Sequence, residues 1–113
     1  SMRPIKKNLI NKVYKICNKF KKAHGAPLYF GNPNNIGIND INKPEYGESV
    51  WIESDEYPVY WACGVTTQAA IMNALQNDII KFAITHAPGH MFITDIKSAD
   101  ADTFNFRVNK GKL

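Results

Sequence analysis

The chain of 113 residues is long enough for one hydrophobic core and too short for two, so we expect a single domain over residues 1–113. Its 14 Lys and Arg against 10 Asp and Glu give a net charge of +4, and 44% of the residues are hydrophobic. No apolar run approaches the roughly 20 residues of a membrane-spanning helix, and the N-terminal residues lack the apolar stretch of a signal peptide. These features argue against a membrane protein and favour an intracellular one, in the cytoplasm or the mitochondrial matrix.

Eight Lys and Arg precede residue 23 in a segment that is also apolar at helical spacing, whereas the first acid is Asp40. The apolar residues that recur at intervals of three and four are Ile5, Leu9, Val13, Ile16 and Phe20. This pattern predicts an amphipathic helix over residues 5–22. Its basic face fits a solvated surface, or an anionic-membrane or nucleic-acid surface. Because interleaved arginines and exposed aromatics are missing, nucleic acid is disfavoured as a partner.

Short strands, bounded by turn-forming residues, are predicted along the rest of the chain. They cover residues 28–30, 49–52, 59–63, 81–85 and 91–96, with a possible edge strand over 104–108. A second helix is predicted over residues 66–77, with Thr66 as its N-cap. Two helices among such strands indicate an α+β domain with a mixed sheet of five or six short strands.

Two of the predicted strands end in small, polar and titratable residues. One stops at Cys63 and Gly64, just before the helix that starts at Thr66, where backbone N–H groups favour a carboxylate or a thiolate. The other stops at His86, with Asp95 one strand further along. Thiol, imidazole and carboxylate at one sheet edge predict a small-molecule site. The alternative for Cys63 is packing as a small apolar residue.

Cys17 and Cys63 have no partners at metal-ligand spacing, and the histidines, His24, His86 and His90, are scattered along the chain. We therefore predict no metal site, and two reduced thiols rather than a disulfide, with Cys17 buried and inert on the apolar side of the first helix. The turn-rich segment 31–40 has backbone N–H groups that can cradle a carboxylate, although its composition favours a structural turn.

Several uncommon strings, in order and spacing, resemble the D-glutamate cyclase family of hydro-lyases. They are Ser1-Met2-Arg3-Pro4-Ile5, His24-Gly25-Ala26-Pro27, Gly31-Asn32-Pro33, Pro58 to Thr66 with Gln68, Ile84 to Gly89, and Thr94-Asp95. The resemblance extends to about residue 97, and family members are longer, so the chain is similar to their C-terminal half. It departs from the family at Thr67, where a proline is usual, and at Asn32, where an acid is common.

The resemblance implies dehydration of D-glutamate to 5-oxo-D-proline, with neither a redox cofactor nor a metal. For this chemistry His86 is the candidate acid and base, Asp95 its orienter or a second carboxylate, and Cys63 an alternative nucleophile. A structural role for His86 in fixing its turn stays open. The candidate substrate-binding residues are Arg3, His24, Gly31, Asn32, Gly64 and Thr66.

Two further classes of function stay open. The chain is a binding module for a small amino acid or carboxylate if it lacks groups that turnover needs. It is an interaction protein if its basic helix docks a partner, or if a second copy replaces the missing N-terminal half. Activity and size in solution distinguish these classes.

Overall fold

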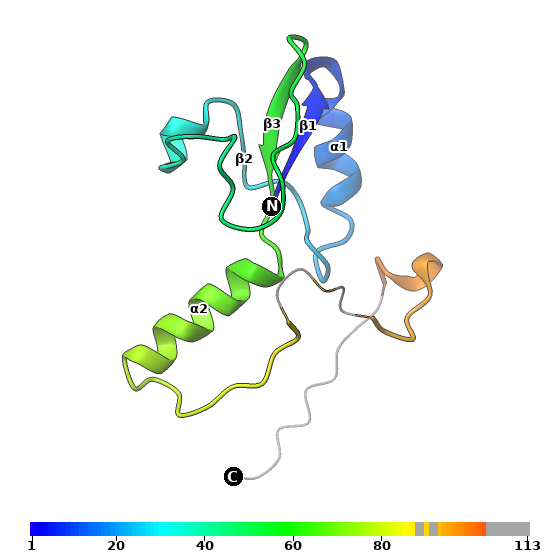
Figure 1. Ribbon diagram of the computed structural model, residues 1–113. Coiled ribbons are helices and arrows are strands. Elements are labelled where there is room, and N and C mark those ends of the chain that lie inside the picture. The colour runs from blue at the N-terminus through cyan, green and yellow to red at the C-terminus, as the bar shows by residue number, and fades with distance from the viewer. Residues whose placement is uncertain (88–89, 91–92, 104–113) are drawn as a thin grey trace.

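The computed structural model describes residues 1–87, 90 and 93–103. The elements of this part, in chain order, are β1 (Met2–Lys6), η1 (Lys7–Leu9), α1 (Ile10–Cys17), β2 (Tyr29–Phe30), η2 (Pro33–Ile36), β3 (Glu56–Tyr60), α2 (Gly64–Gln76) and η3 (Ser98–Asp100). The α+β class with two main helices is therefore confirmed (Figure 1). The predicted sheet is wrong: within the described residues it has three strands, all antiparallel, in the order β1-β3-β2.

The central strand β3 accommodates a proline because of its register with β1. Ser1 and Trp61 exchange both backbone hydrogen bonds, each of 2.8 Å, just beyond the end of the ladder. Since hydrogen-bonded and non-bonded pairs alternate in an antiparallel ladder, Pro4 and Pro58, which lie opposite each other, form a non-bonded pair. Neither missing N–H then interrupts the pairing of β1 with β3.

The predicted helix over residues 5–22 is shorter and starts later than expected. Residues up to Lys6 form β1, and α1 covers only Ile10–Cys17. The pairing of Met2–Lys6 with β3 accounts for the late start, because it places Ile5 and Lys6 in the sheet. Cys17 is half-buried rather than buried, and neither Cys17 nor Cys63 is in a disulfide.

Several predicted strands are corrected as well. The strand expected over 59–63 lies at Glu56–Tyr60, whereas residues 49–52, 81–85 and 93–96 have no strand structure. These segments find no partner strand among the described residues, and a strand needs one for its backbone N–H and C=O groups. Residues 91–92 and the edge strand predicted over 104–108 lie outside the described residues.

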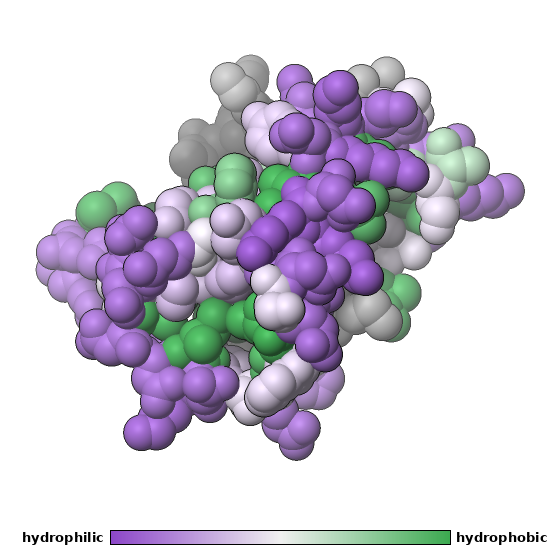
Figure 2. Space-filling view, turned by 90° about the horizontal axis from the view of Figure 1, so that it is seen from above, coloured by the Kyte–Doolittle hydropathy of each residue, from purple (hydrophilic) through white to green (hydrophobic). Residues whose placement is uncertain are grey.

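The core of the described residues is small. Its buried hydrophobic side chains are Ile10, Val59 and Tyr60, and Val59 is fully enclosed. The centroid of the Tyr60 ring lies 6.0 Å from that of the Tyr29 ring, but the buried hydroxyl of Tyr60 has no hydrogen-bond partner among the described residues. Figure 2 shows apolar surface exposed between the hydrophilic side chains on the face viewed from above. None of the helices in the described part is long and apolar enough to cross a bilayer.

Candidate functional site

The four residues that follow β3 tie together segments from distant parts of the chain. Trp61 pairs with Ser1, and the carbonyl of Ala62 accepts a 2.8 Å hydrogen bond from Nδ1 of His24. Cys63 caps α2, and Gly64, its first residue, lies against His86. The candidate site is built around this junction between the sheet and α2 (Figure 1).

Cys63, and not Thr66 as predicted, is the N-cap of α2. Its sulfur accepts from the backbone N–H of Thr66, while the Thr66 hydroxyl oxygen accepts from the backbone N–H of Cys63 at 3.2 Å. Burial raises the pKa of the Cys63 thiol, but the N–H groups of Thr66 and Val65, the positive charge of the Ser1 amino group and the Thr66 hydroxyl together outweigh it, so the pKa lies below its ordinary value. The helix start thus favours the thiolate form of Cys63 over the thiol.

His86 approaches the first turn of α2 closely because Gly64 has no side chain. A Cβ on Gly64 would lie 2.8 Å from Nε2 of His86 and 2.9 Å from its Cε1. One turn further along, the side-chain Nε2 of Gln68 donates a 2.5 Å hydrogen bond to the backbone carbonyl of His86. The helix therefore holds His86 at two points, by its ring and by its backbone.

The hydrogen bonding of the His86 ring indicates which nitrogen is basic. Nδ1 lies 3.1 Å from the carbonyl oxygen of Ala87. A carbonyl only accepts, so Nδ1 carries a proton, and in the neutral ring Nε2 is the nitrogen with the lone pair. That nitrogen is on the side of the ring toward Gly64, next to the capped helix start.

A second set of residues borders the junction from the side of β1. Arg3, His24, Ser1 and Trp61 line an open hollow of about 260 Å³. Arg3 uses one of its N–H groups in a 2.7 Å bond to the carbonyl of Met2. With five donors in a planar fork, a guanidinium can still bind a carboxylate in this arrangement.

Gly31 and Asn32 lie at the other end of the short strand pair. Gly31 donates its N–H to the carbonyl of Pro58 at 3.1 Å, and Asn32 caps η2 by accepting from the N–H of Asn34. Gly31 thus lies next to Pro58, one residue from Val59, which pairs with Arg3 on the other side of β3. The hydrogen bonds of Gly31 and Asn32 are those of a structural turn.

Asp95 is exposed and, within the described ranges, makes no hydrogen bond or ion pair with His86. The role of Asp95 as orienter of His86 stays a prediction, and Nδ1 of His86 lies near the carbonyl of Ala87. Within the same ranges, no group of three or more His, Cys, Asp or Glu side chains is placed to hold a metal ion.

Gln68 was not predicted as a site residue, although it belongs to the strings that carry the resemblance. Sequence reasoning treated it as a helix former only. A signal was nevertheless present at Gly64, because glycine is a poor helix former and often marks a close approach of another group to the backbone.

Comparison with known proteins places this arrangement in a family. The family model of D-glutamate cyclase matches residues 1–95. Proteins named "putative hydro-lyase" are 52% identical over 100 residues in Natranaerobius thermophilus and 53% identical over 96 residues in Acinetobacter baumannii. A further one in Cupriavidus pinatubonensis is 52% identical over 96 residues. The chain therefore belongs to the D-glutamate cyclase family.

The matches cover most of this chain but a minor part of the relatives. They take in 88% of the chain and 37% of the N. thermophilus protein, and 85% of the chain and 34% of the A. baumannii and C. pinatubonensis proteins. The chain thus spans only about a third of the length of these curated relatives.

Proposed function

We propose that the chain carries the acid–base part of a hydro-lyase site that converts D-glutamate to 5-oxo-D-proline and water. The observation that supports this most strongly is the docking of the His86 ring on Gly64, with Nε2 as its basic nitrogen. The membership of the family and the hydro-lyase names of its relatives agree with this chemistry.

The reaction makes specific demands on this site. The amino group of glutamate must lose a proton before its nitrogen attacks the carbon of the side-chain carboxyl group. As the C–N bond forms, a second proton of the nitrogen passes to a carboxylate oxygen, and the hydroxyl that results then leaves the carbon. In the proposal Nε2 of His86 accepts the proton of the amine and returns it to the departing hydroxyl, which leaves as water. Proton transfer of this kind accelerates a reaction typically by about 10²–10⁴-fold.

Cys63 serves in this proposal as the cap that fixes the start of α2 beneath His86. A thiolate attacks an unactivated carboxylate poorly, and the Cys63 sulfur is already engaged by the N–H groups of the first turn. A serine caps helices well. The variant Cys63→Ser should therefore keep most of the activity, whereas a nucleophilic role requires its loss.

In the proposal, the α-carboxylate of the substrate, which does not react, binds in the hollow next to the junction. Arg3 offers the paired donors that a carboxylate prefers, and His24 lies beside it with Nδ1 anchored on Ala62. The variant Arg3→Gln should raise KM with little effect on kcat, because it removes binding that ground state and transition state share.

The proposal is tested by following 5-oxo-D-proline formation from D-glutamate, with L-glutamate as the control substrate. His86→Ala should lower the rate about 10²-fold or more, whereas the matched variant His90→Ala should change it less than about threefold. Equal rates for the chain and His86→Ala would refute the acid–base assignment.

A second candidate is a module that binds the same dicarboxylate without turnover. It is favoured by one observation: the chain spans about a third of the length of its relatives and so holds only part of the residues of a family member. Saturable binding of D-glutamate without product would favour this candidate.

A further inference from the structure

The helix α2 has the composition of a buried helix but no buried residue. Gly64–Gln76 contains no Asp, Glu, Lys or Arg. Its apolar side chains lie on opposite sides, with Val65 and Met72 on one side and Ala70 and Ala74 on the other, at 100° per residue. A helix that has apolar side chains on opposite sides and carries no charge is normally enclosed by other protein. Here Met72 is 55% exposed, and no residue of α2 is buried.

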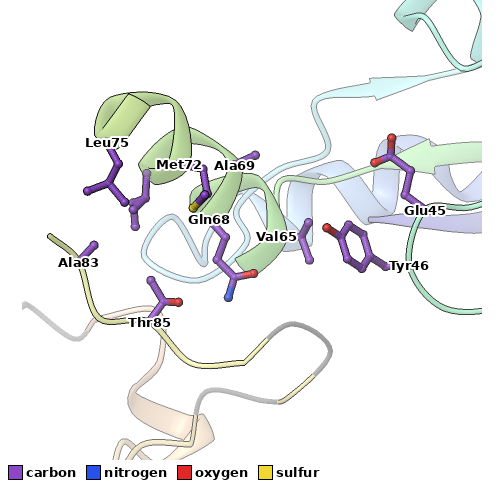
Figure 3. Close-up of a pocket in the computed structure, with 10 residues that line it drawn as sticks. Glu45, Tyr46, Val65, Gln68, Ala69, Met72, Leu75, Ala83 and Thr85 are labelled. Carbon is purple, nitrogen blue, oxygen red and sulfur yellow. The ribbon is translucent and has the colours of Figure 1, made fainter. Parts of the chain in front are cut away.

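The segment that follows α2 extends this apolar surface. Ile79, Phe82 and Ile84 are 72%, 80% and 92% exposed. A groove of about 390 Å³ runs between α2, Tyr46 and the segment that carries Thr85. Figure 3 shows α2 side chains directed toward that segment, with Tyr46 facing the start of the helix. We call the surface made by Val65, Met72, Ile79, Phe82 and Ile84 the α2 face.

We propose that the α2 face is an internal interface, filled by the part of the D-glutamate cyclase fold that the longer relatives have and this sequence does not contain. The matched region is 34% of the A. baumannii relative, so two thirds of that protein are available to cover it. An uncharged helix needs an apolar covering, because a charged group buried against it would be left without a partner.

A second copy of the chain would cover the α2 face less completely than the additional part of the longer relatives. A two-fold pair of α2 helices covers one side of each helix, which leaves either Met72 or Ala74 in water. A longer polypeptide can cover both sides of α2 and also Ile84. The surface of α1 is charged, because it carries Lys12 and Lys15, and it is not part of the proposed interface.

The experiment compares the 113-residue chain with a chimera, in which residues 1–95, which the family model matches, replace the corresponding residues of the A. baumannii relative. The substitution Met72→Asp is made in both proteins. Ile16→Asp is the matched control, because Ile16 also lies in a helix and is 47% exposed against 55% for Met72. Thermal midpoints are measured, together with hydrogen exchange of the α2 amides.

Met72→Asp should lower the thermal midpoint of the chimera by about 5 °C or more and that of the chain by less than about 2 °C. Ile16→Asp should have the same effect in both. If the substituted chimera does not fold, exchange of the unsubstituted proteins decides: α2 amides should exchange at least about 100-fold more slowly in the chimera.

Unchanged exchange of α2 between the two proteins would overturn the proposal. So would a stable homodimer of the chain, seen by light scattering, that Met72→Asp dissociates, because a second copy would then be the occupant. Neither readout depends on catalysis, so an inactive chimera would count against the proposed function and leave this inference standing.

Discussion

The ring of His86 lies so close to the backbone of Gly64 that a Cβ at that position would stand 2.8 Å from Nε2. A side chain there displaces the ring, since non-bonded carbon atoms prefer separations of about 3.5–4.0 Å. The first residue of α2 thus determines where the imidazole can sit.

Gly64→Ala should therefore reduce activity although it favours the helix. Alanine is a better helix former by about 1 kcal/mol, so α2 itself gains stability. The displaced imidazole should lower kcat about 100-fold, the effect expected of a displacement of about 1 Å. The ring proton signals of His86 in an NMR spectrum should shift as well. Thr67→Ala, in the same turn, is the control, and a fully active Gly64→Ala enzyme would disprove the positioning role.

Gln68→Leu should release the backbone of His86. The loss of one hydrogen bond and the unpaired carbonyl together cost about 1 kcal/mol of folding stability. Activity should fall about tenfold, through kcat more than KM. Gln76→Leu, at the last residue of the same helix, removes an exposed amide and should leave both quantities unchanged. Equal effects of the two variants would show that Gln68 acts through helix stability alone.

The thiol of Cys63 should react as a low-pKa cysteine. Alkylation is measured against pH in a Cys17→Ser background, so that Cys63 alone reports. Because the folded chain favours the thiolate, the rate should reach half its plateau below pH 9.0, the ordinary value for a thiol. Thr66→Val removes a donor to the sulfur and should slow the reaction at pH 7 about threefold. Thr67→Val should not, and a midpoint at or above 9.0 in the parent chain would contradict the capping geometry.

Tyr60→Phe should stabilise the fold. Within the described part of the chain, the buried hydroxyl of Tyr60 has no hydrogen-bond partner, and burial, together with the charge of Tyr29, raises its pKa. Phenylalanine keeps the ring and removes the desolvated group, so the free energy of unfolding should rise by about 1 kcal/mol in urea titrations. The exposed Tyr57 provides the control variant Tyr57→Phe, which should have no effect. A loss of stability in Tyr60→Phe would mean that the hydroxyl has a partner.

The parts of the fold that depend on local signals were predictable from the sequence. A run of strong helix formers marks α2. The polar and titratable residues around Cys63 and His86 mark two segments whose ends lie close together. The α+β class followed from the same signals.

Long-range pairing was not predictable in the same way. The apolar spacing of residues 5–22 suits one helix, yet the pairing of Met2–Lys6 with β3 makes its first part a strand. Likewise residues 81–85 read as a strand, but no partner strand lies beside them in the described part of the chain. The contacts of Gly64 and Gln68 with His86 depend on how the segments meet, which no local pattern contains.

The location of the site is tested most directly by NMR titration of the isotope-labelled chain with D-glutamate. The account predicts saturable shifts of the backbone amides of Gly64 to Thr67 and of the His86 ring, which His86→Ala or Arg3→Gln weakens. It predicts no comparable shifts at Gly31 and Asn32. No shift at the helix start in a folded sample, or shifts confined to the Gly31 loop, would contradict it.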